Sequence, residues 1–187
     1  QEYIENLKEE ITEEINANLQ LAFDENAVEC VESKELKEVY FDFDYQHIEP
    51  KSNSKENIRF VDAISQGLEQ SMYRHNELII MGQDVADYGG VFKITEGFVP
   101  KFGKSRVRNT PICESAIVST AMGLSINGMK AVVEMQFADF VSSGFNPIVN
   151  YLAKVHYRWN EKADVVIRMP CGGGVGAGPF HSQTNEA

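Results

Sequence analysis

The chain has 187 residues and a formal net charge of −11, all of which comes from its first third. Residues 1–57 carry 16 acidic and 5 basic side chains, whereas residues 58–187 carry 12 of each. The chain has no basic stripe that could bind nucleic acid, and the phosphates of a nucleic acid would repel its acidic segment. The acidic residues are explained by a surface exposed to solvent. The three cysteines lack Cys-x-x-Cys spacing, and no apolar run reaches the length of a membrane span. We therefore expect a cytoplasmic protein without a disulfide framework, a cysteine-bound metal or a membrane anchor.

The acidic segment begins with an expected amphipathic helix. Apolar residues recur in it at spacings of three and four: Ile4, Leu7, Ile11, Ile15 and Leu19. A second short helix is expected at about 25–30, and residues 50–57 have the polar composition of a linker. Because the chain begins without Met and stops at Ala187 without a natural ending signal, we expect it to be a piece of a longer protein.

From residue 58 on, short apolar strands alternate with helices. Strands are expected at 78–81, 106–108, 131–133 and 165–168, and helices at 61–72, 95–102, 114–126 and 140–157, the last bent at Pro147. This alternation predicts an α/β fold, with a mostly parallel sheet and helices on both faces. Ligands of such sheets bind beyond the carboxyl ends of the strands, where residues 82–90, 136–140 and 170–181 fall.

Glu114 is the first candidate site residue. It precedes a run of small and apolar residues from Ala116 to Gly128. A carboxylate in that position has few water partners, which favours a shared or retained proton, as needed to hand a proton to a heterocyclic cofactor. The alternative is a glutamate placed in the first turn of a helix by the helix dipole. Glu114 alone does not decide between the two.

Three further candidates lie in the last third of the chain. The glycine-rich run 172–178 lacks the Gly-Lys-Ser/Thr ending of a P-loop and the helix start of a dinucleotide fingerprint, so a flexible loop that approaches a ligand is favoured. His181, just after it, would by itself be a surface residue. Phe140 is either an ordinary core residue or a flat surface for a heterocycle.

Seven motifs occur in an order and at a spacing that identify a family. They are Gly82-Gln83-Asp84-Val85, Tyr88-Gly89-Gly90-Val91-Phe92, Thr95-Glu96-Gly97, Thr110-Pro111-Ile112-Cys113-Glu114, Glu134-Met135-Gln136-Phe137-Ala138-Asp139-Phe140, Gly172-Gly173-Gly174 and His181-Ser182-Gln183. From Arg59 on, the chain resembles the β-type half of the thiamine-diphosphate-dependent decarboxylating component of 2-oxoacid dehydrogenase complexes. The run from Gln136 to Phe140 looks more like the branched-chain branch than the pyruvate branch.

The resemblance implies a truncated pyrimidine-binding domain of the thiamine diphosphate-binding fold. It implies that Glu114 hydrogen-bonds a ring nitrogen of the aminopyrimidine, that Phe140 lies beside that ring, and that His181 contacts the reacting carbonyl and the lipoyl group. Mg²⁺ would be held by the α-type half, so no metal ligand is expected from the side chains of this one. The family also has a K⁺ site made of backbone carbonyls, and Ala163 and Val165 align with two of its donors.

The implied activity is decarboxylation of a branched-chain 2-oxoacid or pyruvate, with acyl transfer to a lipoyl-bearing acyltransferase, in an intact and homo-oligomeric assembly. In the family, an α-type half ends with helices like those expected near the start of this chain. We therefore predict two domains: 1–57, the tail of a fused α-type half plus a linker, and 58–187, a truncated β-type domain. The alternatives are a transketolase-like enzyme and a non-catalytic docking module that uses only residues 1–30.

Overall fold

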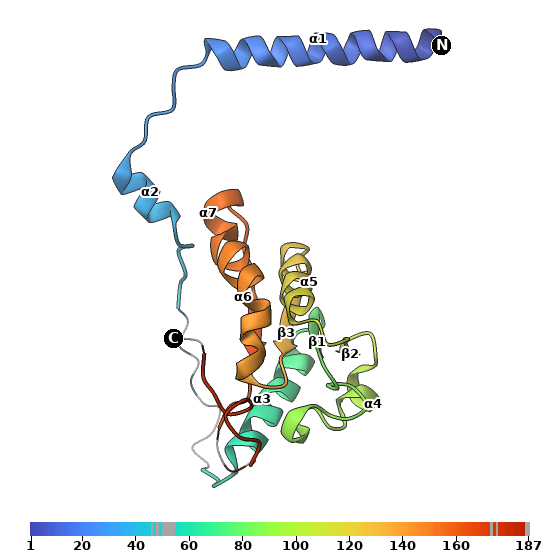
Figure 1. Cartoon of the computed structure of the whole chain (residues 1–187), viewed down its shortest axis with the longest axis vertical. Coiled ribbons are helices and arrows are strands. Elements are labelled where there is room, and N and C mark those ends of the chain that lie inside the picture. Colours follow the sequence, from blue (N-terminus) through green and yellow to red (C-terminus); the bar gives the residue numbers. More distant parts are fainter. Residues whose placement is uncertain (46, 48, 50–54, 173, 175, 186–187) are drawn as a thin grey trace. The chain divides into compact units, whose positions relative to one another are not determined.

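The computed structural model describes residues 1–45, 47, 49, 55–172, 174, 176–185, and its chain divides into two compact units, Gln1–Lys37 and Glu38–Ala187 (Figure 1). The first unit contains helix α1 (Glu2–Asp24), which has the predicted amphipathic pattern but buries none of its residues. The predicted helix at 25–30 is wrong. Glu25 has extended backbone, and the second helix, α2 (Glu32–Glu38), begins later. Glutamates in its first turn and Lys37 in its last turn suit the helix dipole.

The second unit is built on a parallel sheet in the order β2-β1-β3-β4. Its strands are β1 (Leu78–Gly82), β2 (Val107–Asn109), β3 (Lys130–Glu134) and β4 (Val165–Arg168). In the register, Ile80 pairs with Val107 on one side and Val132 on the other. Every residue of β1 is buried, as expected of a central strand covered on both faces. The predicted parallel sheet is therefore confirmed.

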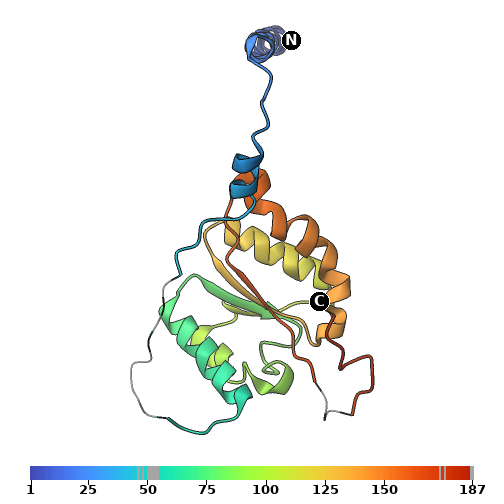
Figure 2. The same ribbon diagram turned by 90° about the vertical axis from the view of Figure 1, so that its left-hand side faces the viewer.

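Helices cover both faces of this sheet. They are α3 (Phe60–Arg74), α4 (Phe98–Phe102), α5 (Glu114–Ile126), α6 (Val141–Asn150) and α7 (Val155–Trp159), with the short 3-10 turns η1 (Val91–Lys93), η2 (Ala138–Phe140) and η3 (Leu152–Lys154). Successive residues of β1 point to opposite faces. Ile80 packs with Met72 of α3 and Phe98 of α4, whereas Ile79 packs with Ile117 of α5. Figure 2 shows the sheet between α3 (teal) and the α5–α6 pair (yellow and orange).

Helix α6 packs closely on α5. At Gly144, an added Cβ would lie 2.8 Å from the Met135 methyl carbon and 3.5 Å from the Glu114 carbonyl oxygen. Pro147 lacks an N–H, so it cannot donate to the Ser143 carbonyl, which instead accepts a 2.9 Å hydrogen bond from the Ser115 hydroxyl. The two helices are thus joined at the carbonyl that Pro147 leaves without its usual partner within α6.

Two predicted helix boundaries differ from the structure. The helix expected over 140–157 is interrupted at Tyr151 (φ −122°, ψ −65°) and not at Pro147, because α6 tolerates the lost hydrogen bond. The helix expected to open at Thr95 begins at Phe98, because Gly97 before it has left-handed backbone (φ 77°). The Thr95 hydroxyl is buried and donates to the Val85 carbonyl at 2.7 Å. None of the helices in the described part of the chain is long and apolar enough to cross a bilayer.

Candidate functional site

The carboxyl ends of β1 and β3 meet at the centre of the sheet. From β1 the chain continues to β2 on one side, and from β3 it continues to β4 on the other. Ligands of open α/β sheets bind in the crevice at such a topological switch point. Gly82 and Glu134 end the two strands as register partners. A Cβ at Gly82 would lie 2.5 Å from the Glu134 carbonyl oxygen, so the approach requires glycine.

The loop after β1, residues 83–97, has unusual backbone at several positions. Three of its non-glycine residues have positive φ: Asp84 (56°), Phe92 (57°) and Lys93 (60°). Internal bonds hold the loop, including one of 2.8 Å from the Gly90 N–H to the Asp84 carbonyl. The Gln136 amide donates to the Asp84 carboxylate at 3.2 Å and ties the loop to the segment after β3. Strained residues persist where the surroundings fix them, and they concentrate at functional sites.

Glu114 is buried at the first residue of α5, with 9% of its surface exposed. Its Oε1 accepts a hydrogen bond of 3.2 Å from Nε2 of Gln83, a side chain that is 4% exposed. The carboxyl group is therefore at the mouth of the apolar helix, where the sequence predicts it, and it faces the loop after β1. The partnership with Gln83 joins positions 31 residues apart and had no local signal in the sequence.

Glu134 is a second buried carboxylate, and it was not among the site residues predicted from the sequence. It is 1% exposed; its Oε2 forms an ion pair with Arg168, and its Oε1 accepts a 3.3 Å hydrogen bond from the Val91 N–H. Burial raises the pKa of Glu134 above its usual range and outweighs the opposite effects of Arg168 and Val91. Glu134 thus ties the loop after β1 to the ends of β3 and β4.

A signal for this ion pair was present in the sequence. Glu134 and Arg168 each end an apolar strand, and the two are register partners in the parallel sheet. Opposite charges at matching positions of two predicted strands are expected to pair once those strands are neighbours.

His181 and Phe140 form a separate aromatic group with Phe137. The His181 ring lies edge-on to both phenylalanines, with centroid distances of 5.0 Å to Phe137 and 5.6 Å to Phe140. The Gln183 N–H donates to Oδ1 of Asp139 at 3.3 Å and so binds the segment that contains His181 to η2. Nδ1 of His181 and the other carboxylate oxygen of Asp139 are buried without a hydrogen-bond partner among the residues described. Buried polar atoms without a hydrogen-bond partner are rare in proteins, so these two atoms need an explanation.

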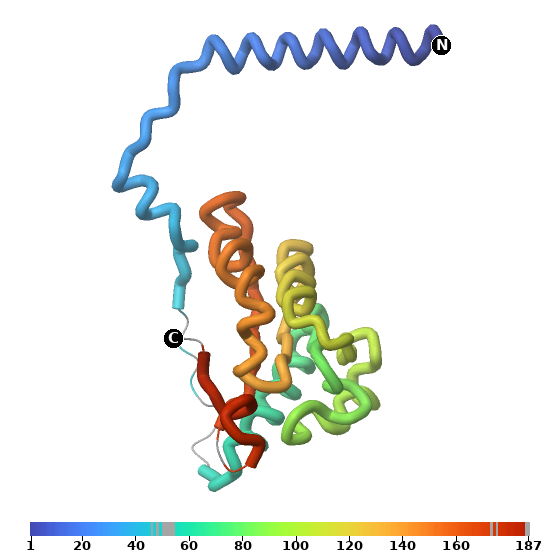
Figure 3. Tube along the Cα trace, viewed as in Figure 1, coloured from blue at the N-terminus to red at the C-terminus, as the bar shows by residue number. Residues whose placement is uncertain are grey.

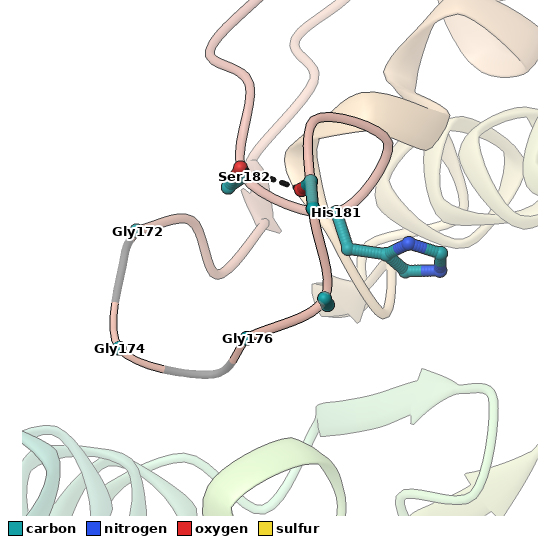
Figure 4. A pocket seen from close by; sticks show the side chains of 7 residues that line it. Gly172, Gly174, Gly176, His181 and Ser182 are labelled. Atoms are coloured by element: carbon teal, nitrogen blue, oxygen red, sulfur yellow. Dashed lines mark hydrogen bonds between the residues drawn. The ribbon is translucent and has the colours of Figure 1, made fainter.

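The segment after β4 folds back on itself, as the dark red end of the trace in Figure 3 shows. The Cys171 thiol donates to the Gln183 carbonyl at 3.1 Å, and the Ser182 hydroxyl donates to the Gly178 carbonyl at 2.8 Å. This loop encloses a hollow of about 190 Å³, lined by Gly172, Gly174, Gly176, Ala177, Gly178, His181 and Ser182. In Figure 4 the His181 ring points away from the labelled glycines. Gly173, part of the predicted glycine loop, lies outside the described residues, as does residue 175.

The three predicted side chains follow three different strands of one sheet. Glu114 follows β2, Phe140 follows β3 and His181 follows β4, so all three come after the carboxyl ends of the strands. His181 and Phe140 are in contact, whereas Glu114 contacts Gln83. Ala163 and Val165, the positions aligned with the K⁺ site, lie at the amino end of β4. No cluster of three or more His, Cys, Asp or Glu suited to a metal occurs within the described ranges.

Comparison with known families identifies this arrangement. The family described as "Transketolase, pyrimidine binding domain" matches residues 56–187. The chain belongs to this family. The match starts just before α3 and includes all four strands, and it confirms the fold expected from the sequence.

Curated relatives are β subunits of 2-oxoacid dehydrogenases. The 2-oxoisovalerate dehydrogenase subunit beta of Bacillus subtilis is 42% identical over 130 residues, which are 68% of this chain and 40% of the relative. The pyruvate dehydrogenase E1 component subunit beta of Leifsonia xyli is 42% identical over 134 residues, 71% of this chain and 40% of the relative. The 3-methyl-2-oxobutanoate dehydrogenase subunit beta of Mycobacterium tuberculosis is 38% identical over 138 residues, 73% of this chain and 40% of the relative.

The matched part of the chain thus spans about 40% of the length of these relatives. The resemblance to a β-type half is confirmed. A branched-chain and a pyruvate relative match at the same 42% identity, so identity does not separate the two branches.

Proposed function

We propose that the chain forms the pyrimidine-binding side of the active site in a thiamine-diphosphate-dependent 2-oxoacid dehydrogenase component. The observation that carries this proposal is the buried carboxyl group of Glu114 at the carboxyl edge of the sheet. A carboxyl group with little access to water suits a hydrogen bond to a ring nitrogen of a heterocycle. The similarity to the β subunits of 2-oxoacid dehydrogenases supports the reaction class.

Glu114 is the residue to which we assign the proton at the cofactor ring. When bound, thiamine diphosphate supplies the nucleophilic carbon and the electron sink that decarboxylation of a 2-oxoacid requires. Glu114 would hold a proton at the ring nitrogen, and its burial keeps water from competing for that hydrogen bond. The aromatic ring of Phe140, which follows β3, would lie beside the aminopyrimidine.

His181 would act on the substrate side, where it would assist acyl transfer to a lipoyl group. Its ring is held between Phe137 and Phe140, and its Nδ1 is buried without a hydrogen-bond partner among the described residues. A held imidazole with an unused nitrogen is suited to exchange a proton with a ligand. Asp139, which follows β3 and has one carboxylate oxygen without a partner among the described residues, accepts a hydrogen bond from the Gln183 N–H in the segment of His181.

The remaining parts of the active site are assigned to partners. The described residues offer no carboxylate cluster for a magnesium-bound diphosphate, and we propose that an α-type half supplies it. We also propose a lipoyl-bearing acyltransferase as the acyl acceptor, a homo-oligomeric assembly in the cytoplasm, and a K⁺ site to which the Ala163 and Val165 carbonyls contribute. In this proposal residues 1–57 are the tail of a fused α-type half plus a linker, and the substrate is a branched-chain 2-oxoacid or pyruvate.

The Glu114→Gln variant of the complete enzyme tests this function. We expect carbon dioxide release from 2-oxoacids to fall by at least about 10²-fold, the usual contribution of a positioned general acid or base, while the fold is retained. Glu96→Gln is the control, because Glu96 is exposed on the loop after β1 and is expected to leave the rate unchanged. A folded Glu114→Gln enzyme with near-normal carbon dioxide release would rule out the assignment.

The two alternatives make different predictions. A transketolase-like enzyme, which the family match also accommodates, would transfer two-carbon units between sugar phosphates and would not need a lipoyl acceptor. A docking module is favoured only by the apolar stripe of α1, none of whose residues is buried. It predicts that the complete protein does not depend on thiamine diphosphate, which the same carbon dioxide assay detects.

A further inference from the structure

The hydrogen bond between Gln83 and Glu114 makes the two oxygens of the carboxyl group unequal. Nε2 of Gln83 donates to Oε1 of Glu114 at 3.2 Å, and both side chains are buried. An amide NH₂ group donates hydrogen bonds and does not titrate. A carbonyl oxygen accepts such a bond better than a hydroxyl oxygen does, so the bond to Oε1 favours Oε2 as the oxygen that carries a proton held by Glu114.

Gln83 is itself held by its surroundings. It follows Gly82, whose carbonyl accepts a 2.9 Å hydrogen bond from the Thr110 N–H in the segment that leads to Glu114. Three residues further on, the Ala86 N–H donates to the Asn109 side chain at 2.7 Å. The backbone on both sides of Gln83 is therefore bound to the end of β2 and the residue after it, and the amide reaches Glu114 from a fixed position.

A second anchor acts on the far end of the same loop. The Val91 N–H donates to Glu134, which is paired with Arg168 and almost completely buried. A side chain at Gly90 would be crowded, since a Cβ there would lie 3.0 Å from the Thr95 hydroxyl and 3.2 Å from Oε1 of Glu134. The loop is thus attached to the sheet at both ends, which limits movement of Gln83.

We propose that Gln83 is a positioning residue for Glu114. It holds Oε1 within the protein and leaves Oε2 as the oxygen that carries and presents the proton to a heterocyclic ligand. This inference rests on the proposed function, since it assigns Gln83 to the same reaction. A role of Gln83 in folding alone would require only that its buried amide be satisfied, and would not link its effect to that of Glu114.

The test is a double-mutant cycle in the complete enzyme, with Gln83→Met and Glu114→Gln. Met has the length of Gln but no donor, so the carboxyl group loses its fixed orientation. We expect Gln83→Met to weaken thiamine diphosphate binding and to lower kcat, each by about 10-fold, since bonds to ionisable groups are the stronger ones. The KM for the 2-oxoacid should change by less than about 2-fold, because Glu114 acts on the cofactor and not on the substrate.

The decisive readout is the affinity for thiamine diphosphate measured by isothermal titration in both backgrounds. In the Glu114→Gln background, Gln83→Met should change this affinity by less than about 2-fold, since residue 114 then has no carboxyl proton for Gln83 to orient. Equal effects of Gln83→Met in the two backgrounds would overturn the positioning role. Gln83→Asn, which shortens the donor but keeps the amide, should reproduce the loss, and it serves if the Met variant fails to fold.

The outcome separates this inference from the function on which it rests. If Glu114→Gln alone leaves cofactor affinity and carbon dioxide release unchanged, the proposed function fails. If Glu114→Gln is inactive but both Gln83 variants behave as the unmodified enzyme does, the function stands and the positioning role of Gln83 is wrong.

Discussion

At the switch point of the sheet, β1 and β3 can approach each other closely because Gly82 has no Cβ. The hypothetical Cβ of Gly82 would lie 2.5 Å from a backbone oxygen, which cannot move aside as a flexible side chain could. We expect Gly82→Ala to lower the free energy of unfolding by about 1–3 kcal/mol, the usual cost of overpacking. Urea unfolding of the purified chain measures this.

Gly67 is the matched control for this substitution. It lies inside α3, and no atom lies within 4 Å of its hypothetical Cβ. Gly67→Ala should therefore raise the free energy of unfolding by about 0.5–1 kcal/mol, because alanine favours a helix interior. A Gly82→Ala protein as stable as the Gly67→Ala protein would contradict the close approach of the two strands.

Glu134 gives the protein a pH-dependent stability of defined sign. Burial raises its folded pKa above the ordinary value of 4.5, so the folded state binds this proton more tightly than the unfolded state does. Stability from this group is fully present below pH 4.5 and is lost as the pH rises through the folded pKa.

The Glu134→Gln variant isolates this contribution. The amide of this variant does not titrate. The unfolding free energy of the original protein minus that of the variant should therefore decrease as the pH rises from about 4.5. Chemical unfolding at a series of pH values measures the difference. A difference that grows with pH would mean that Arg168 dominates over burial and that the pKa is lowered.

For His181, the contact with two phenylalanines and the unpartnered Nδ1 lead to a prediction about two half-reactions. His181→Ala in the complete enzyme should impair acyl transfer to lipoyl at least as much as decarboxylation, by about 10²-fold if the residue acts as a general acid or base. The two half-reactions are assayed separately. Full activity in both would return His181 to the role of a surface residue.

At the scale of elements, the sequence predicted what depends on local pattern. The apolar runs at 78–81, 131–133 and 165–168 mark strands because a parallel sheet buried on both faces requires continuous apolar residues. The helices α3 and α5 are also where apolar spacing and the Asn127-Gly128 ending place them. The misplaced boundaries involve tertiary contacts, such as the burial of Thr95 and the packing of α6 on α5.

In the site, too, local features could be predicted from the sequence and contacts between distant segments could not. The position of Glu114 could be predicted because burial at the start of an apolar helix is a local property. Its contact with Gln83 depends on β1 and β2 being neighbours, and the Glu134–Arg168 pair depends on the register of β3 and β4. Neither pairing can be read from spacing along the chain, because each joins segments more than 30 residues apart.

At the scale of the whole molecule, we propose that the chain carries part of an active site. The matched region corresponds to about 40% of the curated β subunits. It contains Glu114 and Phe140, which we assign to the pyrimidine ring. The second compact unit begins at Glu38, where Phe41 lies edge-on to His156 at 5.5 Å and beneath the ammonium group of Lys162. The domain boundary expected at residues 57 and 58 stays a prediction.

A partner is therefore expected to complete the cofactor site. A magnesium-bound diphosphate is held by carboxylates and by a backbone nest, and these interactions provide much of the affinity of such a cofactor. Within the part of the chain that is described, no cluster of potential metal ligands offers this. The central claim is thus that Glu114 acts on one end of a cofactor whose other end is bound by an α-type half.

Isothermal titration of thiamine diphosphate with Mg²⁺ tests this claim most directly, on the 187-residue chain alone and on the complete enzyme. We predict weak binding to the chain alone, and tight binding to the complete enzyme that Glu114→Gln weakens and the exposed control Glu96→Gln does not. Dissociation constants on the order of micromolar or below for the chain alone would contradict the account, because the diphosphate site would then lie within these residues.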